Sequence, residues 1–194
     1  MTPVRLVRLG VATAALALVT AGTTVPADAH DNGTFQLQDR CDPETFPAFI
    51  GCVDNDQGSV EWERFLEELG DGGEHHWAID PSERTIRHTD DVVAHNVGGE
   101  FHTFTEVTRF GTGCVPELNV AVAPAGPALI MGGKDPCLPE NAEAVFIGSA
   151  VDVNQRRSFG KLSTGVHRFE CLIHPWMRAV VVVEDDDHGH RGHH

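Results

Sequence analysis

The sequence predicts an all-β protein, a sandwich of short strands preceded by a helical and irregular extension. From residue 76 onward, short runs rich in Val, Phe, Thr and Ile alternate with Gly, Pro, Asp and Asn. No long helical pattern separates these runs, which is typical of strands that pair in antiparallel sheets. Upstream, one stretch at 59–69 has apolar residues that recur with a helical period. We therefore expect a sandwich or a barrel with one helix before it.

A long insertion interrupts the strand pattern. Residues 111–143 contain too many Gly and Pro residues for a continuous strand, so we expect a long loop there. The last ten residues, 185–194, read DDDHGHRGHH and offer no side chain that could form a core. The expected strands are 76–79, 85–88, 92–96, 101–108, 120–123, 144–147, 165–171 and 179–184.

The helix expected before the strands is SVEWERFLEEL, at 59–69. Its apolar side chains fall mostly on one face, Ser59 is a suitable N-cap, and Gly70 follows its last residue. We expect the apolar face to pack against the main domain. Residues 30–58 are rich in Asp, Gly and Pro and are expected to form an irregular lead-in.

Composition excludes some classes of function. The chain has 194 residues, enough for one sizeable domain or two small ones. Its formal net charge of −15 argues against binding to nucleic acid or to an anionic membrane, because both surfaces would repel it. There is no tyrosine, which excludes any mechanism that uses a tyrosyl side chain.

The start of the chain has the pattern of an export signal. Arg5 and Arg8 precede an apolar run at 9–22, and Ala27-Asp28-Ala29 fits the small-x-small cleavage pattern. The run is short for a bilayer span, and no later stretch could form one. We expect residues 1–29 to be a signal peptide and the mature chain to be exported, either secreted or periplasmic.

The five cysteines predict two disulfides and one free thiol. If each cysteine pairs with the one nearest to it in the sequence, Cys41 joins Cys52 and Cys114 joins Cys137, although four cysteines allow three connectivities. Cys171 is left over; the alternatives are a buried, inert Cys171 or a disulfide that includes Cys171 and leaves another cysteine free. A free thiol in an oxidising compartment is a liability unless something occupies it.

Residues 171–177 bring together three metal-binding side chains. Cys171, His174 and Met177 supply a thiolate, an imidazole and a thioether. A loop between two strands can direct all three to one point, and this set suits copper, with one further imidazole completing the site. Structural zinc sites rarely use methionine, and iron–sulfur clusters need several thiolates.

The spacing Cys-x2-His-x2-Met resembles the copper loop of the cupredoxins, the small blue copper proteins, and amicyanin most of all. The upstream segment VVAHNVGGEFH at 92–102 resembles the strand and Asn- and Gly-containing turn that precede the other histidine ligand of that family. The resemblance covers residues 76–184. It implies a Greek-key β-sandwich with one type 1 copper ion held by His102, Cys171, His174 and Met177.

The resemblance also implies a function. The family carries electrons, so we expect the chain to be an electron carrier and not an enzyme, because a complete ligand set leaves no position open for a substrate. The acidic charge favours a redox partner protein with a basic docking patch. His174 is expected near the surface, with Pro175 and Trp176 as an apolar docking patch. A non-redox copper protein for carriage, storage or resistance is the alternative.

Four parts of the chain follow from these observations: a signal peptide at 1–29, an extension with one helix at 30–75, a cupredoxin domain at 76–184 and a disordered His/Asp-rich tail at 185–194. The extension at 30–75 has no counterpart in a minimal cupredoxin, and the 111–143 insertion is longer than the family leads us to expect.

Other histidines offer competing interpretations. His95 competes with His102 for the upstream position, and the Asn-to-His spacing of the family favours His102. His30, if cleavage made it the N-terminus, could chelate copper as in the oxidative polysaccharide monooxygenases. The histidines of the tail could capture metal weakly. Ordinary strand or solvated positions are expected for His75, His76, His88 and His167.

Overall fold

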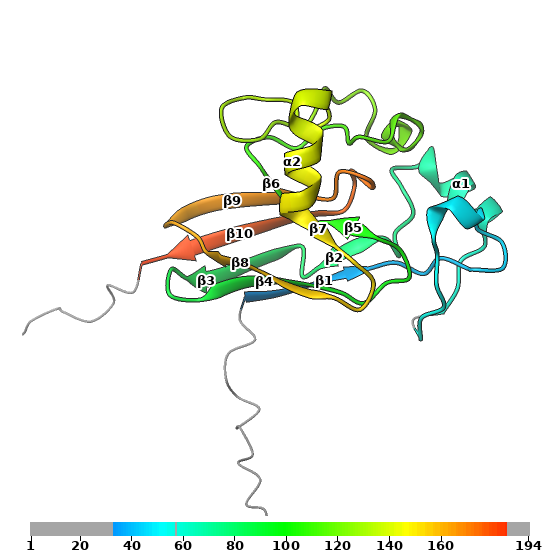
Figure 1. Ribbon diagram of the computed structural model, residues 1–194, viewed down its shortest axis with the longest axis horizontal. Coiled ribbons are helices and arrows are strands. Elements are labelled where there is room, and N and C mark those ends of the chain that lie inside the picture. The colour runs from blue at the N-terminus through cyan, green and yellow to red at the C-terminus, as the bar shows by residue number, and fades with distance from the viewer. Residues whose placement is uncertain (1–32, 57, 186–194) are drawn as a thin grey trace, which may run out of the picture.

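The computed structural model describes residues 33–56 and 58–185. These residues form two four-stranded sheets, with strand orders β2-β1-β4-β8 and β3-β10-β9-β6 (Figure 1). Buried side chains from both sheets, such as Phe35 and Val92 of one and Phe169 and Val181 of the other, belong to a single core. The prediction of an all-β sandwich is confirmed. The expected signal peptide, His30 and the tail histidines lie outside the described residues.

Of the ten strands in the described residues, eight form the two sheets of the sandwich. All strand pairs are antiparallel except β1 with β4 and β3 with β10, so both sheets are mixed. A separate two-stranded sheet joins β5 to β7. The strands are β1 (Thr34–Gln38), β2 (Ala78–Asp80), β3 (Glu83–Arg87), β4 (Asp91–Asn96), β5 (His102–Thr103), β6 (Thr105–Val107), β7 (Ala150–Val151), β8 (Arg156–Lys161), β9 (Gly165–Glu170) and β10 (Arg178–Glu184).

Alternation of side chains along the strands produces the core. In β10, Ala179, Val181 and Val183 are buried, while Val180 and Val182 between them are partly exposed. Successive residues of a strand point to opposite faces, so one face of β10 meets the other sheet. The strands expected at 76–79, 85–88, 92–96, 165–171 and 179–184 are present, with small shifts at their ends. The strand expected at 101–108 is divided into β5 and β6, which belong to different sheets.

The local structure differs from the expectation in four places. Residues 144–147 lie in a helix, α2 (Pro139–Ser149), which begins with Pro at its first turn and continues with the helix formers Glu and Ala. Residues 120–123 lie at the end of the 3-10 helix η3 (Pro116–Val122) and not in a strand. The polar edge strand β8 was not expected at all. The lead-in at 30–58 is not wholly irregular, because it contains β1.

Strand β1 inserts the extension into the first sheet. It runs parallel to β4, with Thr34 opposite Val93, and antiparallel to β2. Phe35 and Leu37 are fully buried in the core. The alternation of β1 is visible in TFQLQ, but the segment is short and follows residues with no strand pattern, which is why sequence reasoning missed it.

Both expected disulfides are present, Cys41–Cys52 and Cys114–Cys137, and Cys171 is free and buried.

Helix α1 (Trp62–Leu69) confirms the amphipathic helix, although its N-cap is Glu61 and not Ser59. Among the described residues, no helix is both long enough and apolar enough to span a membrane.

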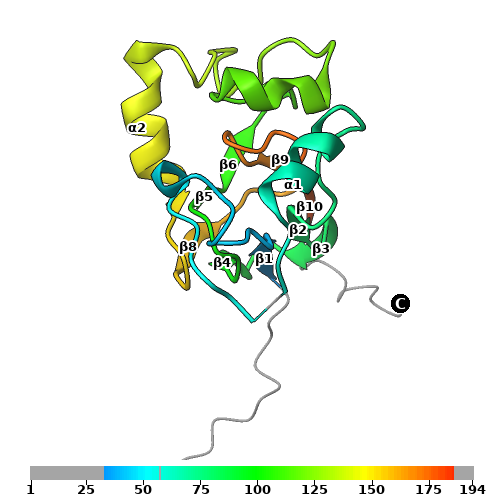
Figure 2. The same cartoon turned by 90° about the vertical axis from the view of Figure 1, so that its right-hand side faces the viewer.

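Helix α1 covers one end of the sandwich. Figure 2 shows it beside the loop that joins β9 to β10, and η3 contacts α1 next to that loop. Phe65 of α1 is 1% exposed, and its ring lies 4.8 Å from that of Trp77, 5.5 Å from that of Phe46 and 6.2 Å from that of Trp176. This aromatic cluster attaches the extension to the sandwich.

Phe65→Ala should therefore destabilise the protein strongly. Removal of a buried phenyl ring leaves a cavity in the aromatic cluster, and we expect the free energy of unfolding to fall by about 3–5 kcal/mol. Urea unfolding followed by tryptophan fluorescence measures it. The matched control is Phe49→Ala, because Phe49 is 88% exposed and its loss should change stability by no more than about 0.5 kcal/mol. Equal effects of the two substitutions would show that α1 does not contribute to the cooperative core.

Candidate metal centre

The loop between β9 and β10 holds three of the four expected ligands. Cys171 directly follows β9, and Met177 directly precedes β10. The main chain closes the loop tightly, because the Cys171 N–H donates to the Met177 carbonyl at 3.0 Å and the Met177 N–H donates to the His174 carbonyl at 2.9 Å. Pairing of the two strands thus brings residues 171, 174 and 177 together at one end of the sheet.

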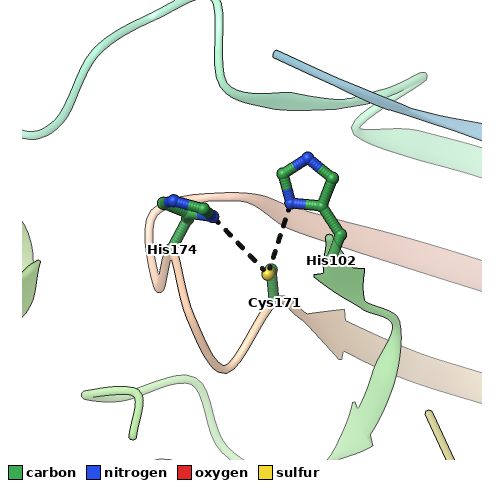
Figure 3. A group of neighbouring side chains, drawn as sticks. All are labelled: His102, Cys171 and His174. Carbon is green, nitrogen blue, oxygen red and sulfur yellow. Dashed lines mark hydrogen bonds between the residues drawn. The ribbon is translucent and has the colours of Figure 1, made fainter. Parts of the chain in front are cut away.

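The fourth expected ligand comes from β5, far away in the sequence. The Nδ1 atom of His102 lies 3.8 Å from the Cys171 sulfur, and Nδ1 of His174 lies 4.0 Å from it (Figure 3). One donor atom from each of the three residues lies within 4.8 Å of the others, and all three side chains are buried. Met177 is also buried, at 1% exposure.

These separations fit a metal ion held between the donors. A thiolate sulfur and an imidazole nitrogen that share one ion in a trigonal plane lie about 3.7 Å apart, given bonds of about 2.3 Å and about 2.0–2.1 Å. The two observed sulfur–nitrogen distances agree with this value. The donor set is a thiolate with two imidazoles, which is a combination that copper prefers.

A buried carboxylate orients the ring of His102. Asp39 Oδ2 lies 2.8 Å from Nε2 of His102, and neither side chain is exposed. This bond directs the Nδ1 atom of the ring towards the sulfur. Carboxylates commonly hold metal-ligating histidines in this way, because they select the tautomer and raise the basicity of the ligand.

Asp39 also fixes the turn that precedes His102. Its carboxylate accepts hydrogen bonds from the main-chain N–H groups of Gly99 (2.9 Å) and Glu100 (3.0 Å). A Cβ atom at Gly98 would lie 1.8 Å from Asp39 Oδ2, so only glycine permits this close approach. On the other side of the turn, the Asn96 side chain donates to the Glu100 carbonyl at 2.7 Å.

A second buried carboxylate faces the other imidazole. Glu100 Oε2 lies 3.3 Å from Nε2 of His174 and accepts a hydrogen bond of 2.6 Å from the Trp77 indole. Burial raises the pKa of Glu100; His174 opposes the shift, and the nearby Asp39 adds to it. Both rings therefore have an acidic partner on Nε2 and the cysteine sulfur near Nδ1.

The charges of the cluster favour a thiolate. Burial alone would raise the pKa of Cys171, but hydrogen bonds from His102 and His174 lower it well below its usual value. Burial would lower the pKa of His102, but the Asp39 hydrogen bond and the adjacent sulfur raise it to about 10. The Thr103 N–H, 3.5 Å from the sulfur, is a further donor towards the thiolate. A thiolate is the form that binds metal.

The environments of the competing histidines differ sharply. His102 is fully buried beside Cys171, whereas His95 on β4 lies 3.4 Å from an Arg156 nitrogen and outside the cluster.

The expectation that His174 lies near the surface was wrong, because it is only 4% exposed. The Phe65 ring lies 6.4 Å from its ring, and Trp176 is held by a hydrogen bond from its indole to the Glu74 carbonyl.

The extension thus covers the surface that was expected to be a docking patch. An apolar cavity of about 670 Å³ remains between α1, η3 and the metal-binding loop, and His174 and Glu100 form part of its wall. Other wall residues include Phe49 and Leu66, which are exposed.

The sequence did not reveal the roles of Asp39 and Glu100. No local pattern connects a carboxylate to a distant imidazole, and Asp39 is 63 residues away from His102.

Comparison with known proteins finds neither a matching family model nor a matching curated protein. Among solved structures, a purple cupredoxin from Nitrosopumilus maritimus is 16% identical, with 57% of this chain and 86% of that chain covered and a TM-score of 0.34. A reduced Cu(I) form of an amicyanin variant is 20% identical (56% and 74% covered, TM-score 0.33). Plastocyanin from Dryopteris crassirhizoma is 14% identical (58% and 91% covered, TM-score 0.34). At these identities and TM-scores the matches carry no argument for function.

Glu170, the residue before Cys171, is a buried acid with incomplete pairing. One oxygen accepts from Arg178 Nε at 3.0 Å and from the Gly111 N–H at 3.1 Å, while Oε1 has no hydrogen-bond partner among the described residues. Burial raises its pKa to about 7, although Arg178 and the Gly111 N–H oppose the shift.

Glu170 should therefore make stability depend on pH. Between its usual pKa of 4.5 and about 7, the folded state keeps a proton that the unfolded chain releases, so its contribution to the free energy of unfolding falls as the pH rises. Urea unfolding of the metal-free protein at about pH 5 and about pH 8 measures this dependence. Glu170→Gln should flatten it, whereas the exposed control Glu83→Gln should not. An unchanged pH dependence in Glu170→Gln would contradict the prediction.

Proposed function

We propose that the chain is an exported blue copper protein that carries electrons, with one type 1 copper ion that Cys171, His102, His174 and Met177 would hold. The observation that carries the proposal is the separation of the Cys171 sulfur from two imidazole nitrogens, 3.8 and 4.0 Å, inside a buried cluster. Two disulfides elsewhere in the chain are in keeping with an oxidising compartment.

A copper ion bound there would supply one-electron chemistry between Cu(I) and Cu(II). The protein supplies a rigid set of donors. Asp39 holds the His102 ring, Glu100 faces the His174 ring, and two main-chain hydrogen bonds close the loop around Cys171 and Met177. Donors fixed in this way need little rearrangement when the charge at the centre changes, and burial excludes water from the site.

The partner in this proposal is a redox protein with a basic docking surface, because the chain carries a strong negative charge. His174 is the ligand that lines the apolar cavity beside α1. Electrons would therefore leave or enter by way of this cavity wall, which replaces the exposed histidine edge expected from the sequence.

Absorption and EPR spectra of the purified protein with added Cu(II) test the proposal. We expect an intense sulfur-to-Cu(II) charge-transfer band in the visible range, because a thiolate is bound directly to the ion. Cys171→Ser should abolish the band, and Met131→Leu, which changes an 83%-exposed methionine, should leave it unchanged. A copper-loaded wild-type protein without this band would reject the assignment of a blue copper centre.

One observation favours a second candidate, a non-redox protein for copper carriage or storage. All three donors are buried, and His174 is covered by the extension. In this case the protein would bind Cu(I) tightly and stay colourless in air, whereas an electron carrier would cycle reversibly with a chemical oxidant and reductant. Spectra recorded through such a cycle distinguish the two functions.

Asp39→Asn should lower the copper affinity of the centre and change its reduction potential. Loss of a carboxylate that holds a ligating histidine commonly lowers metal affinity about 10–100-fold. Loss of a buried negative charge also disfavours Cu(II) relative to Cu(I), so the reduction potential should rise. Competition titration and redox titration measure the two effects. Asp42→Asn is the control, because Asp42 lies on the same segment and its side chain accepts a hydrogen bond from the Glu44 N–H, outside the cluster. Equal affinities and potentials for both variants would refute a role for Asp39.

A further inference from the structure

A second cluster of metal-binding side chains lies outside the buried centre. Glu74, His75 and His76 each offer a donor atom within 4.8 Å of the others, on the segment between α1 and β2. The Glu74 side chain is 1% exposed, whereas those of His75 and His76 are 69% and 26% exposed. The cluster therefore has a buried carboxylate at its base and two imidazoles that reach solvent.

The donor atoms converge on one carboxylate oxygen. Glu74 Oε1 lies 3.1 Å from Nδ1 of His75 and 2.7 Å from Nδ1 of His76. Oε2 of Glu68, in the last turn of α1, lies 3.7 Å from the same nitrogen of His75. The other Glu68 oxygen pairs with Arg64, so each oxygen of that carboxylate faces a different partner.

Two of these three distances fit a four-coordinate ion. Two donors that share one tetrahedral ion, with bonds of about 2.0–2.1 Å, lie about 3.3 Å apart. The separations of 3.1 and 3.7 Å lie near that value, whereas the 2.7 Å between His76 and Glu74 is the length of a hydrogen bond. Two imidazoles with carboxylate oxygens form a nitrogen and oxygen donor set that suits borderline divalent ions such as Zn(II) and Cu(II), rather than Cu(I).

The carboxylate is held in place by the fold. The His76 N–H donates to Glu74 Oε2 at 2.7 Å, which leaves Oε1 directed at the two rings. The main-chain carbonyl of Glu74 accepts from the Trp176 indole at 3.1 Å, and the Trp176 ring lies against Gly73. A preorganised buried donor with two accessible imidazoles distinguishes this cluster from an ordinary group of surface acids.

We propose that Glu74, His75 and His76, assisted by Glu68, bind a divalent transition-metal ion of the Zn(II) or Cu(II) class at a second site, where bonds to the ion replace the hydrogen bond between His76 and Glu74. This site shares no donor with the cluster of His102, Cys171 and His174. It lies beside that cluster, because Trp176 connects Glu74 to the metal-binding loop. The two sites can therefore be tested separately.

Zn(II) is the probe for the experiment, because it is redox-silent and diamagnetic. Equilibrium dialysis of the full chain measures bound zinc, and NMR of the imidazole nitrogens, with the resonances assigned from the variants, reports on His75 and His76 individually. We expect the resonances of both rings to shift with bound zinc. His75→Gln and His76→Gln should each lose one equivalent of zinc, and Cu(II) should displace zinc from the wild-type site.

Controls separate this site from the others. Cys171→Ser should leave the zinc-dependent shifts of His75 and His76 unchanged, whatever happens at the buried cluster. His88→Gln, which changes a partly exposed histidine at the end of β3, should bind as much zinc as the wild type. The tail histidines are present in every variant, so any zinc that they bind is the same in each and cancels in the comparison. Wild-type zinc binding in both His75→Gln and His76→Gln, or unshifted resonances at these two rings, would overturn the proposal.

Discussion

The hydrogen bond between Asp39 and His102 is the interaction on which the rest of the site depends. Asp39 lies one residue after β1, and His102 is the first residue of β5. Their side chains can meet only because β1 pairs with β4 and brings the extension beside the turn before β5. A buried carboxylate is costly unless it is fully hydrogen-bonded, and Asp39 meets that requirement through the ring and the N–H groups of the turn.

The extension consequently belongs to the site and does not merely precede it. Asp39 contributes the partner of one imidazole, and Trp77, just after the extension, donates to the carboxylate that faces the other. Helix α1 adds the aromatic side chain that covers His174. Together these contacts enclose the donor cluster more completely than the resemblance to small blue copper proteins implied, and they move its accessible side to the apolar cavity.

Local sequence patterns predicted the parts of the fold that depend on near neighbours. Alternating apolar residues identified β10, and the helical period identified α1. The same reasoning failed at 144–147, where an apolar run fits a strand or a helix equally well and the preceding Pro, Glu and Ala residues decide for the helix. It also failed for β8, because an edge strand with one paired neighbour does not need an apolar pattern.

By itself, the sequence determined which side chains could bind metal and that one thiol had to be left unpaired. Cys171, His174 and Met177 lie within one loop, and the cysteine count left one sulfur over, so neither inference needed the fold. Only the tertiary structure decided that His102 meets this loop, that Asp39 and Glu100 face the two imidazoles, and that His174 is covered. Those relations join residues far apart in the chain, and strand pairing and packing, which no local pattern encodes, bring them into contact.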